Sequence, residues 1–230
     1  MDRVEWAMTE LVIFDLDGVL IDSEVLASRA LAEELTALGH PITTEAVIER
    51  FVGVSSAVLL TDLAQERGAP LPDDFTERAR ARMQALYRRD LRPVTGAAEA
   101  LAALTLPRCV ASNSPADYIA RTLDLTGLAA HIAPDARFSA EMVANPKPAP
   151  DVFLHAAETM GAAPARCVVI EDSVAGVTAA RAAGMTVLGF AGAGHITDRA
   201  AHCARLRAAG AQHLLDDFAL LTDVIVAARS

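Results

Sequence analysis

Lysine is almost absent from this chain of 230 residues. Arginine supplies all but one of the 20 basic side chains, and the single lysine is Lys147. The 30 acidic side chains outnumber them and give a formal net charge of −10. Nucleic-acid binding depends on clusters of basic side chains, so this acidic balance argues against a nucleic-acid partner. A composition bias explains why lysine is rare, but not why one is retained.

Cysteine and long apolar runs are also scarce. Cys109, Cys167 and Cys203 match neither the even count of a disulfide framework nor the paired spacing of a zinc site. We therefore expect free thiols in a reducing compartment. No apolar run approaches the ~18 residues of a membrane span, and no secretion signal follows the acidic start. These absences predict a cytoplasmic protein without a membrane partner.

Short apolar runs alternate with helical segments over most of the chain. The runs lie at residues 11–14, 108–111, 167–170, 186–190 and 213–215, and they are mainly apolar rather than alternating. Such runs are typical of strands that are covered on both faces. Helices with a capping residue at the start or glycine after the end separate several of them. The alternation predicts an α/β fold, with a Rossmann-like parallel sheet wrapped by helices.

One stretch interrupts this alternation. Between the first and second predicted strands, residues 22–91 show only helical patterns, at 23–38, 44–52, 55–67 and 73–89. A helical run of this length between two strands indicates an inserted all-helical domain. We therefore expect a core domain formed by residues 1–21 and 92–230 and a helical domain formed by residues 22–91.

An Asp-x-Asp-Gly motif follows the first predicted strand. Asp15 and Asp17 can both reach the carboxyl edge of the sheet, where open α/β sheets bind ligands. Gly18 permits a tight turn and a close approach of the backbone. The two carboxylates could bind Mg²⁺, which takes oxygen ligands. The alternative interpretation is a capped turn, because aspartate is common in turns.

Three further groups of polar residues follow predicted strands or precede helices. Ser112 and Asn113 end the second strand, where a hydroxyl and backbone amides suit an anion. Lys147 lies between two prolines in a stiff loop ahead of a helix. Glu171 and Asp172 end the third predicted strand, where acidic side chains are costly unless they meet a cation. The order of these groups is hard to explain by structure alone.

With these four motifs the chain resembles the haloacid dehalogenase superfamily of phosphohydrolases, in the subfamily with a helical cap after the first motif. The resemblance implies that Asp15 attacks phosphorus and that Asp17 acts as general acid and base. It also implies a Mg²⁺ site and a phosphoryl site. The metal residues would be Asp15, Asp17 (through its backbone carbonyl), Asp172 and Glu171, and the phosphoryl residues would be Ser112, Lys147, Asn113 and Gly18.

The resemblance narrows the substrate to a small phosphorylated metabolite. The start of the cap and residues 153–157 are similar to the 6-phosphogluconate phosphatase branch of bacterial phosphosugar phosphatases. Arg50, Ser55 and Ser56 would contact the substrate from the cap, although a solvated helix end would also explain Arg50. His195, in a glycine-rich loop after a later strand, is a weaker candidate for the site. The oligomeric state is expected to be a monomer or a small homo-oligomer.

Two functions other than hydrolysis are compatible with parts of the sequence. The first is a sugar phosphomutase similar to β-phosphoglucomutase, but Ala27 stands where such enzymes carry a histidine, and the basic cap residues near the Gly-Val-Ser loop are missing. The second is a non-catalytic phosphoacceptor or binding module of the receiver type. Receiver domains lack a helical insertion after the first strand, so the enzyme interpretation is favoured.

Overall fold

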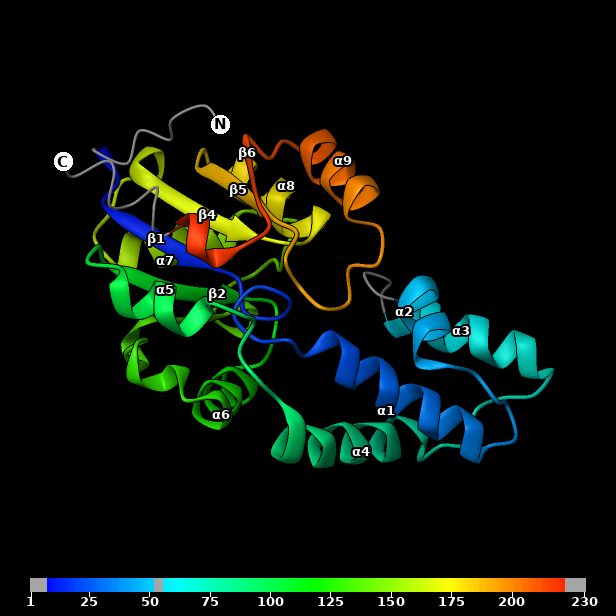
Figure 1. The fold of residues 1–230 in the computed structure, drawn as a ribbon. Coiled ribbons are helices and arrows are strands. Elements are labelled where there is room, and N and C mark those ends of the chain that lie inside the picture. The colour runs from blue at the N-terminus through cyan, green and yellow to red at the C-terminus, as the bar shows by residue number, and fades with distance from the viewer. Residues whose placement is uncertain (1–7, 52–55, 222–230) are drawn as a thin grey trace. The chain divides into compact units, whose positions relative to one another are not determined.

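The computed structural model describes residues 8–51 and 56–221, and the chain divides into two compact units. One unit joins the residues up to 22 with those from 92 onward, and the other spans residues 23–91. The first unit contains a sheet with flanking helices, whereas the described part of the second unit is helical (Figure 1).

The first unit is built on a parallel sheet of six strands in the order β3-β2-β1-β4-β5-β6. In β1, Val12 is paired with Arg108 on one side and with Val168 on the other. Every residue of β1 and of β4 is buried, which explains their continuous apolar sequences. The predicted fold class is confirmed. The strands are β1 (Leu11–Phe14), β2 (Arg108–Ser112), β3 (Arg137–Ser139), β4 (Cys167–Glu171), β5 (Thr186–Phe190) and β6 (His213–Leu215).

Helices cover both faces of this sheet. Because parallel strands are joined by right-handed crossovers, α5 and α6 lie on one face and α7, α8 and α9 lie on the other (Figure 1). The predicted cap of α8 is confirmed, since Ser173 Oγ accepts a hydrogen bond from the backbone N–H of Gly176. The helices are α5 (Ala97–Ala103), α6 (Ala116–Thr126), α7 (Asp151–Thr159), α8 (Val174–Ala182) and α9 (Arg199–Ala209).

The second unit has a small core of its own, which includes Leu35, Phe51 and Phe75. An ionic cluster joins α1 to α4, because the buried carboxylate of Glu34 pairs with Arg78 at 2.6 Å and with Arg82 at 3.1 Å. Burial of this carboxylate is tolerated because two guanidinium groups face it. The helices are α1 (Glu24–Ala37), α2 (Thr44–Phe51), α3 (Ser56–Arg67) and α4 (Phe75–Asp90).

The strand order of the sheet changes direction at β1. From β1 the chain continues to β2 and β3 on one side, and then returns to add β4, β5 and β6 on the other side. Open α/β sheets bind ligands beyond the carboxyl ends of the strands that flank such a change. The ends of β1 and β4 are therefore the place to search for a site. Within the described ranges, no helix has the length and apolar character that crossing a bilayer requires.

Candidate active site

Three buried carboxyl groups gather where β1 and β4 end. Asp15 directly follows β1, Glu171 is the last residue of β4, and Asp172 follows it. The pairing of the strands brings them together, because the backbone N–H of Asp15 donates to the carbonyl of Ile170 at 2.9 Å. One oxygen atom from each of the three carboxyl groups lies within 4.8 Å of the other two. Two motifs that are far apart in the sequence thus form one acidic cluster.

The chemistry of this cluster fits a divalent cation. Burial, followed by repulsion from Glu171, raises the pKa of Asp15 to about 8, although Lys147 opposes the shift. The ammonium of Lys147 lies beside Asp15 and Glu171, and a further cation would favour the charged forms of the three buried carboxyl groups. Ligand atoms that are all oxygen suit a hard ion such as Mg²⁺.

Lys147 reaches into the cluster from the loop before α7. Its Nζ donates to Asp15 Oδ1 at 2.6 Å and to the backbone carbonyl of Ala111 at 2.9 Å, and it lies 3.4 Å from Glu171 Oε1. It also lies 4.6 Å from the centre of the Phe153 ring. Burial opposes the charge of Lys147, but the attraction of Asp15 and Glu171 outweighs it, so its pKa is raised above the usual value. The ammonium is therefore charged and held beside Asp15.

The side chain of Asn113 holds the backbone of this lysine. Asn113 Oδ1 accepts from the backbone N–H of Lys147 at 2.9 Å, and Asn113 Nδ2 donates to the carbonyl of Lys147 at 3.1 Å. The two hydrogen bonds fasten the loop before α7 to the end of β2. The sequence predicted Asn113 as an anion-binding residue, but it did not reveal this contact between the two motifs.

For the phosphate release that the sequence resemblance implies, Asn113→Ala is expected to lower kcat/KM roughly 30-fold, since two hydrogen bonds worth about 1 kcal/mol each are lost beside Lys147. Asn145→Ala is the matched control, because Asn145 lies in the same loop and its Nδ2 donates to Asp151 at an exposed position. Steady-state kinetics of both variants check this result. Equal activities of the two variants would show that the contact does not position Lys147.

Ser112 is the last residue of β2 and is buried at the same edge of the sheet. Its Oγ accepts a hydrogen bond from the backbone N–H of Ser114 at 3.0 Å. A hydroxyl that accepts one hydrogen bond keeps its own proton for another acceptor. The geometry is therefore compatible with the predicted contact between Ser112 and a phosphoryl oxygen.

Asp17 does not join the acidic cluster through its side chain. Its Oδ2 accepts from Ser114 Oγ at 2.8 Å, and its Oδ1 accepts from the hydroxyl of Tyr118 at 2.7 Å. Asp15 and Asp17 therefore occupy different surroundings, although both follow β1. The sequence-based prediction missed Ser114 and Tyr118 as partners of Asp17, and their spacing near the start of α6 was the only available signal.

Gly18 leaves room for Asp172. It has a positive φ of 76°, and a Cβ atom at this position would lie 2.1 Å from Asp172 Oδ2. The glycine thus permits both the turn after β1 and the close approach of the Asp172 carboxylate. His195 lies close to the same turn, with its Nε2 3.7 Å from Asp172 Oδ2. Burial, with a smaller effect of His202, lowers the pKa of His195 to about 4, so its ring is neutral near pH 7.

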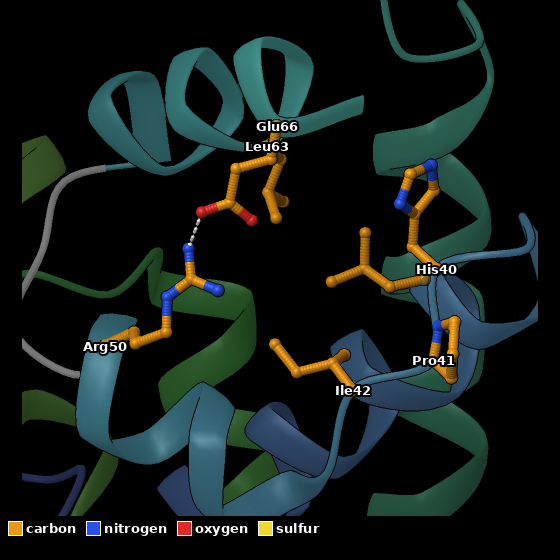
Figure 2. A pocket seen from close by; sticks show the side chains of 7 residues that line it. His40, Pro41, Ile42, Arg50, Leu63 and Glu66 are labelled. Carbon is orange, nitrogen blue, oxygen red and sulfur yellow. Dashed lines mark hydrogen bonds and ion pairs between the residues drawn. The ribbon is translucent and has the colours of Figure 1, made fainter. Parts of the chain in front are cut away.

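Of the residues predicted to bind substrate from the helical unit, the structure describes only the side chain of Arg50. Arg50 forms an ion pair with Glu66 and lies over the ring of Phe51, 4.7 Å from its centre. Figure 2 shows this pair beside a cavity of about 200 Å³ within the helical unit. Ser55 and the side chain of Ser56 lie outside the described residues. The cavity is lined by Leu35, His40, Pro41, Ile42, Arg50, Leu63 and Glu66.

Several known proteins are similar to this chain in sequence or in fold. 6-Phosphogluconate phosphatase of Escherichia coli (strain K12) is 34% identical over 187 residues, which cover 81% of this chain and 84% of that protein. Hexitol phosphatase B of the same strain is 34% identical over 178 residues, which cover 75% and 79%. The structure of a HAD family hydrolase from Deinococcus radiodurans R1, with bound phosphate and sodium, matches with a TM-score of 0.84 at 33% identity and covers 97% of each chain.

A family model matches residues 9–184, a range that contains all four motifs and every residue of the acidic cluster. The parallel sheet places those motifs at its carboxyl edge, as the resemblance implied. The chain therefore belongs to the haloacid dehalogenase-like hydrolase family.

Proposed function

We propose that this enzyme is a Mg²⁺-dependent phosphatase that releases phosphate from small phosphorylated metabolites, with phosphosugars as the preferred class. The contact of Lys147 Nζ with Asp15 Oδ1, at 2.6 Å, carries the proposal. It places a charged ammonium beside a buried carboxylate, where it can bind a non-bridging oxygen of the phosphoryl group that Asp15 attacks. The relatives named for 6-phosphogluconate and for hexitol phosphates support this substrate class.

Asp15 is the nucleophile in this mechanism. One of its carboxylate oxygens bonds to phosphorus while the bond from phosphorus to the leaving oxygen breaks, and Asp17 donates a proton to that oxygen. Water then attacks phosphorus and gives a proton to Asp17. The bond from phosphorus to Asp15 breaks, so inorganic phosphate leaves and both carboxyl groups return to their initial states.

The phosphoryl group is held by Ser112, the backbone amide of Asn113 and the ammonium of Lys147, next to the turn at Gly18. Donors fixed before the reaction stabilise the charge that develops on the transferring group. Lys147 also keeps Asp15 oriented, because it contacts Asp15, Ala111 and Glu171 at once.

Asp15, Asp172 and the backbone carbonyl of Asp17 would hold the Mg²⁺ ion. When bound, Mg²⁺ offsets the negative charge of the phosphoryl group and of the carboxylates. Glu171 is not a direct ligand of the ion in this proposal. Its carboxylate already accepts hydrogen bonds from the N–H of Asp172 at 2.9 Å and from Ser173 Oγ at 2.8 Å. These contacts suit a residue that orients Asp172 and Lys147.

The proposal assigns substrate selection to the helical unit. In this proposal, residues 22–91 form the cap, and residues 1–21 and 92–230 form the catalytic core. Arg50, Ser55 and Ser56 are candidate contacts of the sugar. Hydrolysis is preferred to a mutase reaction, since two relatives that are each 34% identical to this chain carry phosphatase names.

Purified protein with Mg²⁺ is expected to release inorganic phosphate from p-nitrophenyl phosphate and from several members of a panel of phosphosugars, including 6-phosphogluconate and hexitol phosphates. Chelation with EDTA should lower the rate roughly 100-fold, because the charge of the metal is lost, and added Mg²⁺ should restore it. Phosphate release measured across the panel checks both statements. Activity on none of these esters would overturn the proposal, and activity that is insensitive to EDTA would overturn its metal dependence.

A further inference from the structure

The carboxylate of Asp17 is held at both of its oxygens by hydroxyl groups from the start of α6. Ser114 Oγ donates to Oδ2 at 2.8 Å and the Tyr118 hydroxyl donates to Oδ1 at 2.7 Å. Both distances are in the normal range for hydrogen bonds between oxygen atoms. One hydrogen bond at each oxygen of the carboxyl group leaves it little freedom to rotate, so this pair fixes the orientation of Asp17.

The backbone segment that carries the two hydroxyl groups is held by residues at and after the end of β3. Ser139 Oγ donates to the backbone carbonyl of Ser114 at 2.8 Å, and it accepts from the N–H of Glu141 at 3.1 Å. The carboxylate of Glu141 accepts from the N–H of Ala116, the first residue of α6, at 2.9 Å. The first turn of α6, which contains Tyr118, therefore has a defined position relative to the sheet. Because this turn is held in place, the orientation that it imposes on Asp17 is well defined.

We propose that Tyr118 and Ser114 are positioning residues for Asp17, and that they determine how well the enzyme cleaves esters with poor leaving groups. The proposal rests on the function proposed above, in which Asp17 gives a proton to the leaving oxygen. An alkoxide leaves only if it is protonated, whereas p-nitrophenolate leaves with little assistance. A misaligned Asp17 thus slows the cleavage of an alkyl phosphate far more than the cleavage of p-nitrophenyl phosphate.

The experiment compares kcat/KM for p-nitrophenyl phosphate with kcat/KM for the best phosphosugar of the panel. This parameter reports the transfer of phosphate to Asp15 and is independent of the later hydrolysis step. Tyr118→Phe is expected to lower kcat/KM for the phosphosugar roughly 10-fold and to change the value for p-nitrophenyl phosphate less than about 3-fold. Ser114→Ala is expected to act in the same direction, and Ser114→Thr, which keeps the hydroxyl, should restore the ratio.

Tyr87→Phe is the matched control, because the same change removes a hydroxyl that donates to the carbonyl of Ser23 in the helical unit. It should leave the ratio of the two kcat/KM values unchanged. An equal loss on both substrates in Tyr118→Phe, or no loss on either, would overturn the positioning role.

Asp17→Asn separates failure of this inference from failure of the proposed function. If Asp17→Asn does not affect the phosphosugar more than the aryl ester, Asp17 is not the general acid and the proposed mechanism is wrong. If Asp17→Asn lowers kcat/KM for the phosphosugar more than for the aryl ester, but Tyr118→Phe does not, only the positioning role is wrong. In the Asp17→Asn background, the Tyr118→Phe change should cause no further loss, because the group that it positions is already gone.

Discussion

Asp15→Asn is expected to abolish phosphate release, with a loss of at least roughly 10⁴-fold in kcat, while the protein stays folded. An amide of the same size cannot form the acyl phosphate that the mechanism requires. The change also removes one negative charge from a buried acidic cluster, so the free energy of unfolding should not fall greatly. Phosphate release and thermal unfolding of the variant, measured side by side, check both parts.

Asp124→Asn provides the control for this experiment, because Asp124 is an exposed aspartate on α6 and lies outside the cluster. It should retain normal turnover. Turnover by Asp15→Asn above a few per cent of the original rate would mean that another group attacks phosphorus.

Lys147→Arg is expected to lower kcat roughly 100- to 1000-fold, although both side chains carry one positive charge. The buried ammonium fits between Asp15 Oδ1 and the carbonyl of Ala111, with the ring of Phe153 alongside it. A planar guanidinium is larger and has its donors in a fixed fork, so it cannot reproduce these contacts without displacing its neighbours. Kinetics with the phosphosugar and circular dichroism of the folded variant check this expectation.

Arg166→Lys is the reciprocal control, since Arg166 forms an exposed ion pair with Glu10 in the same unit. Exposed pairs of this kind contribute little to stability, so this variant should behave like the original protein. Near-normal activity of Lys147→Arg would remove the requirement for a compact ammonium and would leave composition bias as the explanation for the single lysine.

The sequence was sufficient to predict every strand of the described sheet except β3, because the other strands are short, mainly apolar and separated by helical segments. The predicted limits of β1, β5 and β6 are confirmed, and those of β2 and β4 differ by one residue. β3 was missed because its three residues, Arg137–Ser139, have polar ends and form no apolar run. α5 was missed as well, since it is a short, alanine-rich segment that begins after Gly96 without a side-chain cap.

Most of the candidate site was predictable because its residues directly follow strands, and Lys147 was predicted from its place between two prolines before a helix. Asp15, Ser112, Glu171 and Asp172 were found in this way, because parallel strands end at a common edge of the sheet. The contacts between motifs were not predictable, since they join side chains that are far apart in the sequence. The contact between Asp17 and Tyr118 and the contact between Asn113 and Lys147 depend on how α6 and the loop before α7 pack.

The central position of β1 has a consequence for synthesis of the chain. β1 is synthesised before the other five strands of the described sheet, yet one of its edges pairs with β4, so the pairing of Leu11 with Cys167 forms only after β4 has been synthesised. Until then, that edge presents unpaired amides and carbonyls that can pair with another nascent chain. The strand that leads to Asp15 therefore has an unpaired edge while the residues between β1 and β4 are synthesised. Protection of this edge and assembly of the acidic cluster occur together, when β4 pairs with β1.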